Sequence, residues 1–107
     1  HAYQAAKTLY LEQRDWIRHA PTCAEAKRRG GQVALRDDWD SVKLRIMEDL
    51  VRQKFSTDPL RQQLLDTGDA ILIESNSWND CFWGVCRDVG ENHLGKILMK
   101  VRDACRA

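Results

Sequence analysis

The sequence predicts a predominantly helical α+β fold with a minimal β-sheet, in a single small domain covering residues 1–107. Three observations lead to this prediction. A chain of 107 residues suits one domain. Several stretches place apolar side chains three or four residues apart, as on one face of a helix. The one short aliphatic run, residues 70–74, lies between turn residues and has the composition of a buried strand.

Three helices are expected in the first third of the chain. The first helical pattern covers residues 1–9 and the second covers 11–19. Thr22 and Glu25 then have the spacing of a capping box, in which the hydroxyl accepts an early backbone N–H and the carboxylate reaches back. We expect this third helix to stop at the glycine pair 30–31, which would supply a left-handed cap.

The rest of the chain predicts three more helices. The most regular pattern covers residues 39–55 and can be capped by one of the aspartates before it. Pro59, preceded by Asp58, suits the first position of the next helix, which Thr67 and Gly68 would end. The last helix is expected over 92–105. Its apolar face is formed by Leu94, Ile97, Leu98, Val101 and Cys105.

Composition excludes several classes of protein. Seventeen basic and sixteen acidic residues leave a net charge of +1, which argues against binding nucleic acid or an anionic membrane through bulk charge. No apolar run approaches the roughly 20 residues that span a bilayer. The four cysteines form no C-x-x-C pair and the three histidines are scattered, so no metal site is expected.

The cysteines also bear on location. Two disulfides would suit a secreted chain, but Cys23 and Cys105 lie in helical patterns where buried, reduced thiols are more common. We therefore expect reduced thiols and a cytoplasmic protein.

The loop after the predicted strand is the candidate site. Residues 75–84 hold two of the four tryptophans, Trp78 and Trp83, together with Asp80, and directly follow Glu74. Polar groups in a loop at the end of a strand commonly form a site. Flat aromatic rings beside carboxylates suit a heterocyclic ligand. The alternative is that the aromatic side chains are core and that Glu74 is a cap or an ion-pair partner.

The start of the last helix is also unusual. Asn92 is a good N-cap residue. Gly95 in the first turn costs about 1 kcal/mol relative to alanine. This cost predicts that another backbone or a ligand approaches closely, and the alternative is tight helix packing.

Eight segments, in order along nearly the whole chain, resemble the NADAR superfamily, which includes the YbiA-like N-glycosidases. The segments are His1-x-Tyr-Gln-Ala-x-Lys7, Ala20-Pro-Thr-x-Ala-Glu-Ala-Lys27, Asp38-Trp-Asp with Lys43 and Met47, Lys54-Phe55, Leu64-Leu-x-Thr-Gly68, Glu74-Ser-Asn-x-Trp-x-Asp80, Phe82-Trp-Gly-Val85, and Asn92-x-Leu-Gly with Leu98-Met and Val101-Arg102. Each segment is a weak signal alone, whereas eight in register are specific.

The resemblance implies a mainly helical α+β domain that hydrolyses an N-glycosidic bond, without a metal or organic cofactor. One branch of the family splits ribosylaminopyrimidine phosphates, which are early riboflavin intermediates. Another removes ADP-ribose, including from guanine bases. The expected partner is therefore a small ribosylated heterocycle or an ADP-ribose derivative, with nucleic acid only as an ADP-ribosylated substrate.

The resemblance also implies roles for individual residues. Breaking a C–N glycosidic bond builds positive charge on the sugar and negative charge on the departing base, and carboxylates stabilise the first. Asp80 and Glu74 are the expected catalytic residues. A lysine or arginine would hold phosphate, and the aromatic rings would stack on the base. The expected substrate-binding residues are Lys7, Arg45, Trp78, Trp83, Gly84, Asn92 and Gly95.

The family's first motif reads Thr-x-Glu-His, and its glutamate is the favoured acid or base. This sequence begins at the histidine, so we expect a domain without the N-terminal segment. Three hypotheses follow: an N-glycoside hydrolase, a non-catalytic module that binds ADP-ribose or a nucleotide, and a helical protein-interaction domain.

Overall fold

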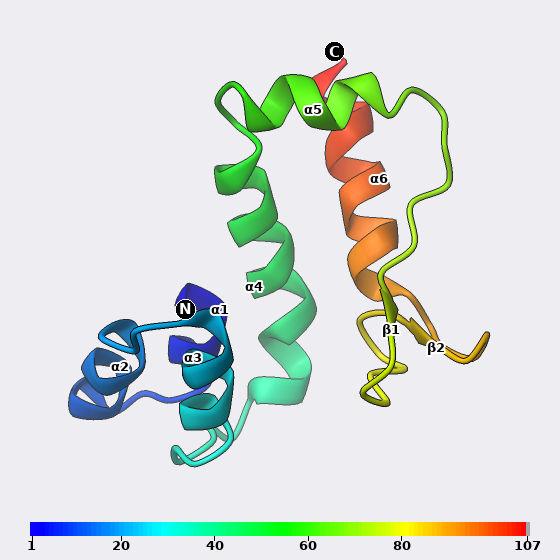
Figure 1. Ribbon diagram of the computed structural model, residues 1–107. Coiled ribbons are helices and arrows are strands. Elements are labelled where there is room, and N and C mark those ends of the chain that lie inside the picture. Colours follow the sequence, from blue (N-terminus) through cyan, green and yellow to red (C-terminus); the bar gives the residue numbers. More distant parts are fainter. Residues whose placement is uncertain (107) are drawn as a thin grey trace. The chain divides into compact units, whose positions relative to one another are not determined.

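The computed structural model describes residues 1–106, and its elements form two compact units, His1–Leu50 and the chain from Val51 onward (Figure 1). The elements are α1 (Ala2–Ala5), α2 (Leu11–Arg18), α3 (Cys23–Gly30), α4 (Trp39–Lys54), α5 (Leu60–Asp66), β1 (Ser75–Asn76), β2 (Val85–Cys86) and α6 (His93–Cys105). This confirms the helical α+β class with a minimal sheet. A single domain over 1–107, whose last residue lies outside the described part, stays a prediction.

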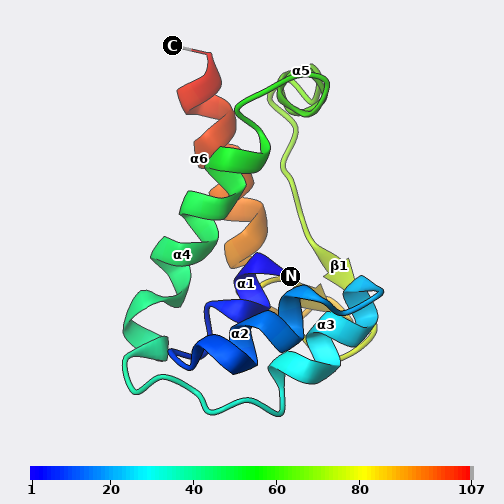
Figure 2. The ribbon, with the colours of Figure 1, turned by 90° about the vertical axis from the view of Figure 1, so that its left-hand side faces the viewer.

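Helices α1, α2 and α3 pack against one another in the first unit (Figure 2). Their core consists of Ala5, Ile17, Ala20 and Ala26, which are all buried, with Val33 packed against them. Small side chains at these positions let short helices approach closely, which is how a segment with few large apolar residues still forms a core.

The third helix begins as the capping box predicts. The Thr22 hydroxyl accepts the backbone N–H of Glu25 at 3.1 Å. Two details differ from expectation. The Glu25 carboxylate is held by arginines one turn further on instead of reaching back. Gly31 ends the helix with φ −77°, a right-handed conformation, because its N–H still bonds the carbonyls of Lys27 and Arg28.

The first helix is much shorter than the expected 1–9. Regular helical bonding stops after α1, where the N–H groups of Lys7 and Thr8 bond carbonyls three residues back instead of four. The carbonyl of Lys7 accepts the backbone N–H of Arg36 at 2.7 Å. Thr8 is fully buried beside this contact. Tertiary hydrogen bonding therefore overrides the helical pattern after α1.

In the second unit, α5 lies across the C-terminal end of α6 (Figure 1). The Arg61 guanidinium donates to the Cys105 carbonyl at 2.8 Å, satisfying one of the open acceptors at that helix end. α5 begins one residue later than expected, with Pro59 as its N-cap. α6 matches its prediction, and Ile97 and Val101 on its apolar face are buried.

The predicted strand over residues 70–74 is wrong. This segment is extended but pairs with no strand, and the side chains of Ile71 and Ile73 are 78% and 58% exposed. Its backbone is hydrogen-bonded to side chains of other residues. Arg102 Nη1 donates to the Ala70 carbonyl at 2.8 Å, and Asn92 binds further along the segment.

The sheet itself follows this segment. β1 and β2 pair in parallel, with Ser75 opposite Val85 and Asn76 opposite Cys86. Within residues 1–106, no helix has both the length and the apolar character required to cross a bilayer.

Candidate active site

Glu74 directly precedes β1 and is anchored by the sheet. Its carbonyl accepts the backbone N–H of Val85 at 2.7 Å. This pairing brings Gly84 so close that a Cβ there would overlap both the carbonyl oxygen and Oε2 of Glu74. Only glycine leaves room for the glutamate at this point, so Gly84 shapes the site by having no side chain.

Asn76 connects the carboxylate of Glu74 to the backbone of Asp80. Its Nδ2 donates to Oε2 of Glu74 at 3.1 Å and to the carbonyl of Asp80 at 2.8 Å. Its Oδ1 accepts the backbone N–H of Asp80 at 3.1 Å. Asn76 was not predicted from the sequence, because its role depends on a turn that brings the backbone of Asp80 back against its side chain. The available signal was an amide two residues after a candidate acid.

The Asp80 side chain organises the turn that follows it. Oδ1 accepts the backbone N–H of Phe82 at 3.2 Å and that of Trp83 at 2.9 Å. This is the capping role that aspartate commonly has in turns. Asp80 is partly buried within the same network as Glu74, and these two hydrogen bonds engage Oδ1 and not Oδ2.

The aromatic side chains of the loop differ in their surroundings. The Phe82 ring packs edge-on against Trp83, with centroids 4.9 Å apart, and contacts His93 at 4.5 Å. Trp78, by contrast, is 56% exposed. The alternative that these rings are all core therefore holds in part for Phe82 and Trp83 and is wrong for Trp78.

Asn92 occupies the N-cap position of α6 but its side chain makes no capping hydrogen bond. Its backbone is left-handed, with φ 54°. The amide instead accepts the N–H of Glu74 at 3.0 Å and donates to the Leu72 carbonyl at 2.9 Å. A Cβ on Gly95 would overlap that same carbonyl, so the close approach of another backbone explains this glycine.

The two predicted phosphate ligands, Lys7 and Arg45, belong to the first unit. Partial burial, and secondarily the charge of Lys27, lower the pKa of Lys7. The ammonium lies 5.8 Å from the centre of the Tyr3 ring. Arg45 is exposed on α4. A role for either in holding phosphate stays a prediction.

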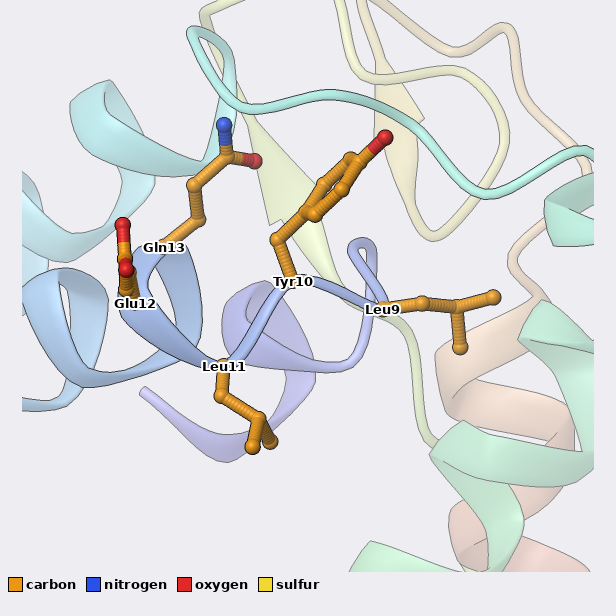
Figure 3. Close-up of a pocket in the computed structure, with 5 residues that line it drawn as sticks. All are labelled: Leu9, Tyr10, Leu11, Glu12 and Gln13. Carbon is orange, nitrogen blue, oxygen red and sulfur yellow. The ribbon is translucent and has the colours of Figure 1, made fainter.

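Hollows lie in both units. In the second unit, a hollow of about 370 Å³ is lined mostly by apolar side chains, with Glu74 among them. In the first unit, a hollow of about 430 Å³ is lined by Leu9, Tyr10, Leu11, Glu12 and Gln13 (Figure 3). None of the predicted site residues lines the latter, so the hollow at Glu74 is the better candidate.

Residues 1–106 offer few other groups for metal or thiol chemistry. That part of the chain contains no group of three or more His, Cys, Asp and Glu residues placed to hold a metal ion. All four cysteines are free thiols. Cys23 is exposed, contrary to the expected burial, because it is the first residue of α3 and faces outward.

Comparison with known proteins identifies the family. A model described as the NADAR domain matches residues 1–106. N-glycosidase Npun_R5314 of Nostoc punctiforme is 44% identical over 113 residues, covering 99% of this chain and 72% of that protein. N-glycosidase YbiA of Escherichia coli is 37% identical over 107 residues, covering 96% of this chain and 66% of that protein.

A third relative, riboflavin biosynthesis protein VVA0006 of Vibrio vulnificus, is 41% identical, covering 96% of this chain and 29% of that protein. The NMR structure of E. coli YbiA superposes with a TM-score of 0.87 at 36% identity, covering 98% of this chain and 64% of YbiA. The chain thus spans just under two thirds of that structure. The family model, the relatives and the shared fold agree, and the chain belongs to the NADAR family.

Proposed function

We propose that this chain is an N-glycoside hydrolase, which cleaves the C–N bond between a ribose or phosphoribose and a heterocyclic base or amine. Two relatives named N-glycosidases, at 44% and 37% identity, support the reaction class. The observation that carries the proposal is the carboxylate of Glu74, which is held beside Gly84 and Asn76. Glu74 is also one of the residues that line an apolar hollow.

The reaction requires little beyond water and positioned charge. The bond between the sugar C1 and the nitrogen breaks, and a water oxygen bonds to C1. One water proton ends on the departing nitrogen, and the hydroxyl stays on the sugar. Glu74 is suited to stabilise the positive charge that develops on the sugar, or to accept the proton of the attacking water. A positioned acid or base typically contributes about 10²–10⁴-fold to the rate.

The neighbouring residues have complementary roles in this proposal. Asp80 fixes the turn through Oδ1 and offers Oδ2 as the second carboxylate oxygen. Trp83 and the more exposed Trp78 provide flat surfaces for the base.

A ribosylaminopyrimidine phosphate is the proposed substrate. One relative is named a riboflavin biosynthesis protein, which supports an intermediate of that pathway. Reduced thiols and a cytoplasmic location fit this reaction and stay predictions.

The test is a hydrolysis assay that follows the released amine or base by chromatography. The full chain is incubated with ribosylaminopyrimidine phosphate and, in parallel, with ADP-ribosylated guanosine. We expect release from the first substrate, whereas release only from the second would move the proposal to ADP-ribose. No release from either, by a folded protein, would contradict it.

A further inference from the structure

The orientation of the Asn76 amide is fixed by its partners. The backbone N–H of Asp80 can only donate, so the atom facing it at 3.1 Å is the carbonyl oxygen Oδ1. The NH₂ group then faces two acceptors, Oε2 of Glu74 and the carbonyl of Asp80. A flipped amide would place oxygen against both of these oxygens and lose all three hydrogen bonds.

The remaining contacts of Glu74 involve its backbone. Its N–H is bound by Asn92 and its carbonyl by Val85. These contacts place the Cα of Glu74 but leave the side-chain torsions to be set by other groups. Asn76 donates the hydrogen bond that the structure gives to the carboxylate itself.

We propose that Asn76 is a positioning residue that holds Oε2 of Glu74, so that Oε1 is the oxygen left to act on the sugar. This inference rests on the proposed function in one respect, namely that Glu74 is the acting carboxylate. Asn76 does not touch the substrate in this scheme. Both of its amide hydrogens and its carbonyl oxygen are already engaged within the loop, so its groups are committed to organising Glu74 and Asp80.

The same amide links the candidate site residues to one another. Asn76 ties Glu74 to Asp80, and Asp80 in turn holds the backbone of Trp83. The candidate acid and the candidate stacking ring are therefore set by a continuous chain of hydrogen bonds. Displacing a catalytic group by about 1 Å can cost about 10²-fold in rate, so breaking this chain of hydrogen bonds should lower turnover.

The first test is independent of catalysis. In the ¹⁵N-labelled full chain, the side-chain NH₂ signals of Asn76 are assigned by their loss in Asn76→Asp, and are followed through the pH range in which carboxyl groups titrate. We expect them to move in the wild type and in Asp80→Asn, and to stop moving in Glu74→Gln. Asp80→Asn is the matched control, because Asp80 is the other carboxyl beside this amide. Equal movement in Glu74→Gln, or none in the wild type, would overturn the inference.

The second test separates positioning from a general structural role. Asn76→Ala should lower kcat by roughly 10–100-fold with KM changed less than about twofold. In a Glu74→Gln background it should lower kcat by a clearly smaller factor, because only its hydrogen bonds to Asp80 are then left to lose. An equal loss in both backgrounds would show that Asn76 does not act through Glu74. Ser77→Ala, at the exposed residue directly after Asn76, should keep wild-type kcat. If no hydrolysis is found in any form, the proposed function fails, and the NMR experiment alone still decides whether Asn76 holds the carboxylate.

Discussion

The side-chain amide of Asn92 binds Glu74 as a neighbouring strand would. Oδ1 accepts the Glu74 N–H at 3.0 Å while Nδ2 donates to the carbonyl of Leu72, two residues earlier, at 2.9 Å. A β-ladder offers the same pair of donor and acceptor to alternate residues of a strand edge. One asparagine on the turn into α6 therefore makes the hydrogen bonds of a neighbouring strand and fixes the backbone at Glu74.

Substituting this asparagine should weaken the second unit. Asn92→Asp removes the donor and places a carboxylate oxygen against the Leu72 carbonyl. We expect a loss of about 1–3 kcal/mol in the free energy of unfolding, measured by urea denaturation. Asp88→Asn makes the reverse exchange at another residue of positive φ, one that is exposed, and should change the free energy of unfolding by less than about 0.5 kcal/mol. Equal losses of stability in the two variants would show that the hydrogen bonds from Asn92 to Leu72 and Glu74 do not stabilise the unit.

Gly84 should be intolerant of any side chain. A Cβ would overlap Oε2 and the backbone carbonyl of Glu74, and the backbone atom cannot swing away. We expect Gly84→Ala to displace Glu74 and to reduce kcat by at least about 10-fold. Gly31→Ala is the matched control, since its added Cβ would meet neighbours at 3.5 Å or more, which is ordinary contact. Wild-type kinetics in Gly84→Ala would show that the position of Glu74 is not critical.

Two substitutions of Asp80 should separate its charge from its hydrogen bonds. Asn keeps an oxygen that can accept the N–H groups of Phe82 and Trp83, whereas alanine keeps none. Asp80→Asn should therefore lower turnover with little change in melting temperature. Asp80→Ala should in addition lose about 1–2 kcal/mol of stability, as for a lost cap. Full activity of Asp80→Asn would remove the carboxylate from the mechanism and leave Asp80 a structural residue.

Acid should remove a contribution from Glu25 in the first unit. A hydrogen bond from Arg28, followed by one from Arg29, lowers the pKa of this carboxyl from 4.5 to about 2. Because the folded-state pKa is depressed, the stabilisation is present above pH 4.5 and is lost as the pH falls toward 2. The difference in unfolding free energy between wild type and Glu25→Gln should shrink across that interval. A difference that is constant with pH would contradict the pairing.

The sequence predicted those features that depend on neighbours in the chain. The Thr22 cap, the helices α2, α3, α4 and α6, and the glutamate before the site loop are all readable from local spacing. The strand over 70–74 was mispredicted because aliphatic composition does not reveal the hydrogen-bond partner. The partners of this segment are two side chains, Asn92 about 20 residues later in the sequence and Arg102 about 30 residues later.

The candidate site shows the same division. Glu74, Asp80 and Gly84 could be selected because they lie in one polar, aromatic loop. Asn76 could not, since its function lies in three hydrogen bonds that exist only once the loop has closed. A glycine in the first turn of a helix, Gly95, was recognisable from the sequence as unusual. Only the fold shows that the Leu72 carbonyl leaves no room for a side chain there.

Glu74→Gln is the change that bears most directly on the whole account, because glutamine keeps the size and an acceptor oxygen for Asn76 while losing the charge. The decisive measurement is the rate of amine release from ribosylaminopyrimidine phosphate by wild type and by this variant, once both proteins have been shown to have the same melting temperature. We expect the variant to be slower by about 10²–10⁴-fold. Equal rates would show that the Glu74 carboxylate does not take part in breaking the bond.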